Sequence, residues 1–148
     1  MGRGKDTVRR HLWRAVLQLM KPAHRTEFLT VPDDPTIRRC IGFARAWGHG
    51  GLIVGNLFAL RSTDPKALYD HSDPIGPDND KHLLSIAQSA CKIICAWGTH
   101  GTLHDRGREV AERLAFFNPA ALKLTADGHP VHPLYVAAST QPKEYFAR

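Results

Sequence analysis

The segment Asn56–Asp64 concentrates side chains that could do chemistry. Asn56 is an amide inside an otherwise apolar run, where it must find partners or carry a desolvation cost of about 1–3 kcal/mol. Arg61, Thr63 and Asp64 add a guanidinium fork, a hydroxyl and a carboxylate just after that run. A guanidinium can hold a phosphate or a carboxylate through two parallel hydrogen bonds. We expect these side chains to bind a ligand; a structural amide and an Arg61–Asp64 salt bridge are the alternatives.

A second group of candidate side chains follows later apolar segments. Trp97 precedes two glycines that would let a ligand approach the backbone closely. His100 or His104 could titrate near neutral pH, although a loop histidine is more often incidental. His132, next to a proline and close to Tyr135, is better placed to act on a ligand.

Metal and cofactor chemistry is not indicated. The nine histidines lack the helical two-histidine spacing with a companion acid that is typical of zinc sites. The glycines form neither a dinucleotide-binding fingerprint nor a P-loop, and no nucleophile elbow is present. We therefore expect no metal and no cofactor.

The composition is that of a globular protein. With 148 residues, 43% apolar and 23% charged, the chain suits one domain with its own core. Its apolar runs are too short to span a bilayer, and three cysteines without a zinc-type pattern favour a reduced, cytoplasmic setting. The net charge of +6 favours polyanionic partners. A nucleic-acid-facing surface that includes Arg39 and a plain solvated basic face are both open.

Apolar periodicity and breaker residues predict alternating helices and strands. An acidic pair followed by proline at Asp33–Thr36 predicts a helix start. The continuous apolar run Leu52–Leu60 predicts a central strand covered on both faces. The stretch ending in Ala15–Met20 fits either a helix or a buried strand. The other expected elements are a helical turn at Lys66–Tyr69, a helix from Asp78, a strand at Lys92–Trp97, a helix at Arg106–Phe117 and a strand at Ala121–Thr125.

This alternation predicts an α/β fold, specifically a three-layer α/β/α sandwich with a mainly parallel central sheet of about four strands. We expect a single domain over residues 1–148, with a basic N-terminal segment at 1–14 and a loosely packed tail at 137–148. Ligands in such folds bind beyond the carboxyl ends of the strands. The segments expected to meet there are Lys21–Glu27, Asn56–Asp64, Trp97–His104 and His129–Tyr135.

Four motifs in a fixed order resemble one family. They are Asp33–Cys40, Gly55–Pro65, Ala96–Gly98 and Gly128–Tyr135. They resemble the bacterial and phage family called domain of unknown function 1643, over about 19–136. That family has no settled activity, so the resemblance implies relatives without naming a reaction.

One loop departs from the family's pattern. Where the family typically has Asn-Pro-Ser-Thr after its first strand, this chain has Lys21-Pro22-Ala23-His24. Lys21 can donate but not accept, so a water or base held by the amide oxygen would lose its acceptor. Either the chemistry is lost, or Lys21 and His24 adapt the site to a more anionic ligand.

A more distant resemblance concerns the order of the motifs. An Asn-Pro-type loop, an Asn-Leu strand followed by Arg-x-Thr, a strand ending in glycine and a late His-Pro loop are similar to those of the uracil-DNA glycosylase superfamily. In that superfamily the first loop positions a water and the last supports the departing base of a flipped-out nucleotide. The resemblance assigns these roles to Lys21-Pro22 and His132-Pro133.

Two hypotheses from different classes follow. The first is a nucleic-acid or nucleotide-directed protein related to uracil-DNA-glycosylase-like base hydrolases, with Asn56 and His132 as catalytic residues. Its substrate-binding residues would be Lys21, His24, Arg39, Arg61, Thr63, Asp64, Trp97 and Tyr135. The second is a catalytically inactive interaction protein, a phage or host-defence factor that retains the fold and binds a protein partner. A small-molecule nucleotide hydrolase or transferase is a third option. Whether the chain is an enzyme stays open.

Overall fold

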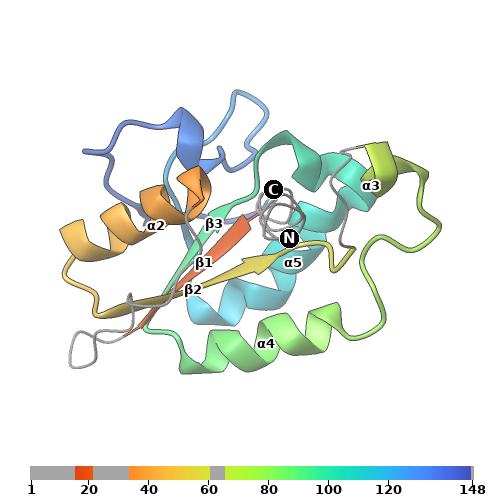
Figure 1. Cartoon of the computed structure of the whole chain (residues 1–148), viewed down its shortest axis with the longest axis horizontal. Helices are drawn as coiled ribbons and strands as arrows, with labels where there is room; N and C mark the ends of the chain where they lie inside the picture. The colour runs from red at the N-terminus through yellow and green to blue at the C-terminus, as the bar shows by residue number, and fades with distance from the viewer. Residues whose placement is uncertain (1–15, 22–33, 61–65, 148) are drawn as a thin grey trace, which may run out of the picture.

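The computed structural model describes residues 16–21, 34–60 and 66–147, the first of these by backbone alone (Figure 1). These residues form a mixed helix-and-strand fold around an open five-stranded sheet of order β2-β1-β3-β4-β5. The strands are β1 Val16–Lys21, β2 Gly51–Asn56, β3 Lys92–Ala96, β4 Ala120–Ala121 and β5 Lys143–Glu144. The stretch that fitted either a helix or a strand therefore forms a strand over residues 16–21.

The sheet is mixed, so the prediction of a mainly parallel sheet is wrong. Strand β1 runs antiparallel to both of its neighbours, β2 and β3. Strand β4 is parallel to β3, and β5 is antiparallel to β4. Alternation of helices and strands does not determine strand direction. The β1–β2 connection brings the chain back to the end of the sheet that it left, because Lys21, the last residue of β1, pairs with Gly51, the first residue of β2.

The apolar run Leu52–Leu60 does not form a central strand. Strand β2 ends at Asn56 and lies at the edge of the described sheet, where most of its residues are only half-buried. The apolar residues Leu57 and Phe58 lie beyond the strand and fill the core, with 0% and 2% of their surfaces exposed. The apolar run in the sequence is thus continuous because the edge strand β2 is followed directly by residues whose side chains, those of Leu57 and Phe58, fill the core.

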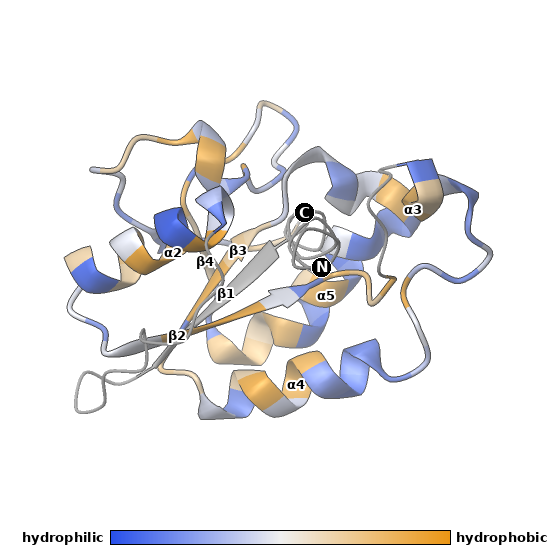
Figure 2. Cartoon of the chain, viewed as in Figure 1, coloured by the Kyte–Doolittle hydropathy of each residue, from blue (hydrophilic) through white to orange (hydrophobic). Residues whose placement is uncertain are grey.

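Helices pack on both faces of the sheet (Figure 1). Helix α2 (Pro35–Ala46) lies on one face, while α4 (Asn79–Ser89) and α5 (Arg106–Leu114) lie on the other. Successive residues of a strand point to opposite faces, and β3 follows this rule. Its Ile94 packs with the α2 cluster, and its Ile93 packs with the α4 and α5 cluster. In Figure 2, β2 and β3 are largely apolar, whereas α2 and α4 alternate between apolar and polar positions.

The start of α2 confirms the prediction made from its sequence. The Asp34 carboxylate accepts hydrogen bonds from the backbone N–H groups of Thr36 and Ile37, at 2.8 and 3.3 Å. This is an N-cap, and Pro35 occupies the first turn, where its missing N–H costs nothing. The remaining short helices are α3 (Lys66–Asp70) and the 3-10 turns η1 (Gly98–Asp105), η2 (Ala115–Phe117) and η3 (Pro133–Tyr135).

The C-terminal tail is more tightly held than the sequence predicts. Residues Lys143 and Glu144 pair with β4, and the Tyr145 N–H donates to the Pro119 carbonyl at 3.0 Å. The Tyr145 ring is 6% exposed and meets Trp97 edge-on, with 6.2 Å between ring centroids. The buried side chain of Tyr145 therefore holds in place a segment whose overall composition predicts a loosely packed tail.

Tyr145 should make stability fall at alkaline pH. Burial, followed by the nearby Cys95 thiol, raises the pKa of Tyr145 to about 12 from its ordinary value of 10.0. Between about pH 10 and pH 12 the unfolded chain has lost a proton that the folded chain retains. The free energy of unfolding therefore falls as pH rises through this window.

Urea unfolding of wild type and Tyr145→Phe at pH 7, 10 and 11 tests this expectation. The variant should match wild type at pH 7 to within about 1 kcal/mol, because the Tyr145 hydroxyl has no hydrogen bond among the described residues. At pH 11 it should lose less stability than wild type. Parallel pH profiles for the two proteins would contradict the assignment.

Candidate functional site

Strands β2 and β3 end at the same edge of the sheet. Val16 of β1 pairs with Asn56 on one side and with Ala96 on the other. Since β1 is antiparallel to both neighbours, β2 and β3 run in the same direction. Their ends are separated by one strand, a distance of about 10 Å at ordinary strand spacing.

Lys21 lies at the opposite end of the sheet. The register pairs Lys21 with Gly51, the first residue of β2. It is therefore about 17 Å along β1 from the level of Asn56. The expected convergence of four segments at one edge is wrong for Lys21, because it assumed that β1 runs parallel to its neighbours. His24, Arg61, Thr63 and Asp64 lie outside the described residues.

The loop after β3 and the late His-Pro loop do come together. The Gly98 N–H donates to the Pro130 carbonyl at 2.9 Å. Gly98 has a φ of +68°, and a Cβ at this position would lie 3.2 Å from the Cβ of His132. Glycine is thus required here both for the left-handed backbone and for the close approach.

His132 is mostly buried, with 8% of its surface exposed, and its ring is held in a defined orientation. Its Nδ1 accepts from the Leu134 N–H at 3.3 Å and caps the turn η3. In the neutral ring this bond leaves the proton on Nε2. Tyr135 lies beside His132, with 5.9 Å between ring centroids, and is 79% exposed.

Trp97 has a packing role and not the predicted ligand contact. Its side chain is 1% exposed and belongs to the core between β3 and α5. A Cβ at Gly101 or at Gly107 would overlap the Trp97 indole. The two glycines that follow Trp97 in the sequence suggested room for a ligand. One of them, Gly101, instead makes room for the indole of Trp97.

Two residues that the sequence analysis missed hold the end of β2. The Asn79 amide donates to the carbonyls of Asn56 and Leu57, at 3.2 and 2.7 Å. The Arg106 Nε donates to the same Leu57 carbonyl at 2.8 Å. Asn79 begins α4 and Arg106 begins α5, so both helix starts are tied to the backbone at Asn56.

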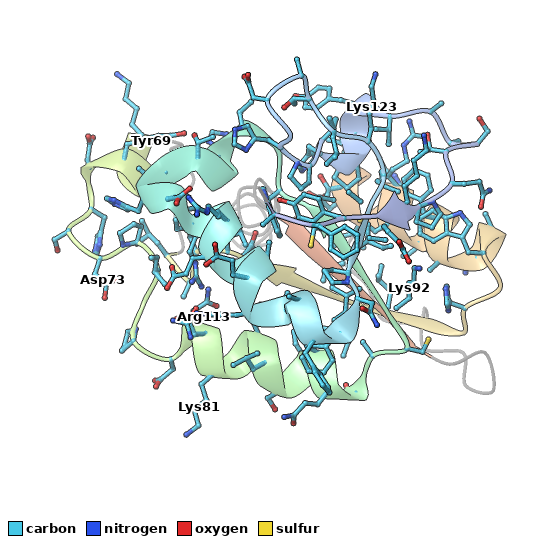
Figure 3. All side chains as sticks on the ribbon, turned by 180° about the vertical axis from the view of Figure 1, so that it is seen from behind. Tyr69, Asp73, Lys81, Lys92, Arg113 and Lys123 are labelled. Atoms are coloured by element: carbon cyan, nitrogen blue, oxygen red, sulfur yellow. The ribbon has the colours of Figure 1, made fainter. Side chains whose placement is uncertain are left out.

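Arg106 is a fully buried cation with acidic partners. Its side chain is 0% exposed, and its NH1 lies within salt-bridge distance of both Asp80 and Glu109. Arg113, between α4 and α5 in Figure 3, pairs with the same two acids. Helical spacing was a readable signal, because Arg106 stands four residues before the buried Val110 and hence on the apolar stripe of α5.

The side chain of Asn56 itself is half-buried at the end of β2. No hydrogen bond joins its amide to another described residue.

A separate contact links α3 to η1. The Tyr69 hydroxyl on α3 lies 2.9 Å from Nδ1 of His100. Figure 3 shows Tyr69 at one end of the molecule.

An open groove of about 550 Å³ runs between α2 and the segment that follows His132. Its walls include Arg38, Arg39 and Phe43 from α2, and Leu134 from η3. The Arg39 NH2 donates to the Val136 carbonyl at 3.0 Å, and its guanidinium carbon lies 5.9 Å from the centre of the Phe43 ring. Of the predicted binding residues, Arg39 is therefore placed in a real concavity.

Neither a metal centre nor a membrane span is found in the described part of the chain. Among those residues, no group of three or more His, Cys, Asp and Glu side chains could hold a metal ion. None of the described helices is long and apolar enough to cross a bilayer.

Comparison with known proteins identifies the family. The family described as "Protein of unknown function (DUF1643)" matches residues 13–134, which is more than half of the chain. The chain therefore belongs to this family. No curated protein and no solved structure matches it at the level that would show a relationship.

The Arg106 network should be a major source of stability. Arg106→Ala leaves Asp80 and Glu109 without the buried cation, and we expect a loss of about 3 kcal/mol or more in the free energy of unfolding. Arg106→Lys should not restore it, because a single ammonium cannot reproduce the fork that contacts Leu57 and both acids.

Urea unfolding measures both changes. The matched control is Arg108→Ala on the same helix, whose exposed pairs with Asp105 and Glu112 should contribute about 0–1 kcal/mol. An Arg106→Ala protein as stable as this control would show that the network does not stabilise the fold.

Proposed function

We propose that the protein acts on nucleic acid or nucleotides at the sheet edge where β2 and β3 end, as a relative of the three-layer, uracil-DNA-glycosylase-like base hydrolases. The observation that carries the proposal is the approach of Gly98 to His132, because it brings the late His-Pro loop to the edge at which Asn56 also lies. The ends of β2 and β3 are about 10 Å apart, with β1 between them.

Each proposed catalytic residue has a role that fits its contacts. His132 accepts at Nδ1, so its Nε2–H is the group that would stabilise negative charge on a departing base. Asn56 would orient the ligand, since its backbone is fixed by Asn79 while its amide bonds no other described residue. In the reaction, water attacks the sugar carbon as the bond to the base breaks, and the base leaves with the bonding electrons. The water gives up one proton to solvent, and the departed base takes up a proton from solvent.

The water-positioning role assigned by resemblance to Lys21 is not part of this proposal. Lys21 lies at the other end of β1, so the substitution of the family's amide there bears less directly on the reaction at Asn56 and His132. Arg61, Thr63 and Asp64 follow Asn56 closely in the chain, and we assign them additional contacts to the ligand.

A base-release assay tests the proposal. The protein is incubated with single- and double-stranded DNA carrying uracil or modified bases, and abasic sites are detected by alkaline cleavage. Removing a positioned acid or dipole should slow release about 100-fold, so we expect this for Asn56→Ala and for His132→Ala. Lys81→Ala, an exposed change on α4, should retain the wild-type rate. Binding without release of any base would remove the hydrolase part and leave the binding part.

A second candidate is an interaction protein without catalysis. It is favoured by two exposed aromatic side chains, Phe116 at 89% and Phe146 at 70%, because large exposed apolar groups often mark protein contacts. In that case the protein binds neither oligonucleotides nor free nucleotides, and a Phe116→Ser change weakens association with a protein partner. Strong binding of a free nucleotide, with none of an oligonucleotide, would instead indicate a small-molecule enzyme.

A further inference from the structure

Helix α2 has an unusual charge pattern. It contains three arginines, at positions 38, 39 and 45, and no aspartate or glutamate. The opposite wall of the groove, residues 129–138, also lacks acidic residues. Helix α5, by comparison, contains glutamates as well as arginines. The groove therefore has arginines on its α2 wall and no acidic residue in the segment on the other side.

The position of one arginine in this groove is fixed in advance. Arg39 is half-buried, and within the described part of the chain its guanidinium has one hydrogen-bond acceptor, the Val136 carbonyl. A guanidinium carries five N–H donors, so the described residues leave several of them for a ligand. Because Val136 and Phe43 hold the group in place, binding an anion costs little side-chain entropy.

On the side opposite α2, the groove is lined by an apolar residue that is followed in the chain by an exposed aromatic one. Leu134 lines the groove and is 41% exposed, and the next residue, Tyr135, is 79% exposed. The turn η3 that carries both residues lies beside α2 (Figure 1). Arginines next to an exposed aromatic ring are the combination with which proteins hold single strands, since phosphates pair with the cations and unpaired bases stack on the ring.

We propose that this groove binds the backbone of a single-stranded nucleic acid, with Arg38 and Arg39 on its phosphates and Tyr135 stacked on a base. The proposal rests on the proposed function and extends it, because the Tyr135 ring touches His132 and a strand in the groove would deliver a base to that residue. A single strand fits better than a duplex, whose bases are already stacked and gain nothing from an exposed ring.

Fluorescence anisotropy with an end-labelled oligothymidylate of about twelve nucleotides tests the proposal. Arg38→Ala/Arg39→Ala should weaken binding about tenfold or more and reduce the salt slope of log K by about 1.4, or 0.7 for each lost phosphate contact. Tyr135→Ala should weaken binding roughly tenfold while leaving the salt slope unchanged. Arg39→Ala is also measured alone, and Arg45→Ala is its matched control, because each removes one positive charge from α2 and Arg45 does not line the groove. Unchanged thermal unfolding of all variants shows that they are folded.

The possible outcomes distinguish failure of the groove proposal from failure of the proposed function. Equal affinity and equal salt slope in wild type and the double variant would overturn the groove and leave the proposed function standing. So would tighter binding of a duplex, of a free nucleotide or of a phosphorylated peptide than of the single strand. If wild type binds neither the oligonucleotide nor a free nucleotide, both proposals fail. Loss of binding in the double variant and weaker binding in Arg39→Ala, together with retention in Arg45→Ala, support the groove.

Discussion

The buried guanidinium of Arg106 is the contact on which the geometry of the sheet edge depends. A cation removed from water is tolerated only with good partners, and Arg106 has Asp80 on α4, Glu109 on its own helix and the Leu57 carbonyl. These contacts connect the starts of two helices to the end of a strand. Asn79 donates to the same carbonyl and to that of Asn56. The backbone at Asn56 is therefore positioned by side chains from α4 and α5, behind the surface that a ligand would meet.

The direction of β1 determines which residues can act together. Because β1 is antiparallel to both β2 and β3, the ends of those two strands share one edge and the end of β1 lies at the other. Asn56 and the loop after β3 therefore share an edge with His132, whereas Lys21 does not. Of the loop 21–24, the structure describes Lys21, and this residue is thus remote from the residues to which we assign chemistry.

Features determined by local sequence were predictable, and features determined by packing were not. The Asp34 cap, the helix after it and the buried strand β3 follow from residue order alone, and the structure confirms them. Strand direction depends on the end of the sheet to which a connection returns, which spacing does not encode. The role of Trp97 was missed because a glycine that admits a ligand and one that admits an indole look the same in sequence. Arg106 was missed because its charge suggested a surface residue, although its helical position indicated burial.

The unequal distribution of charge between α2 and α5 also affects how the molecule meets other molecules. Helix α2, on one face of the sheet, carries arginines and no acids, whereas α5, on the other face, carries both arginines and glutamates, so the two helices present different charges to an approaching molecule. For a polyanion that binds in the groove as proposed, the arginines of α2 would favour encounters in which this face meets it first. Productive encounters then become frequent at low ionic strength and decline as salt shortens the range of the field. The lifetime of a complex, by contrast, would depend on short-range contacts that salt screens much less.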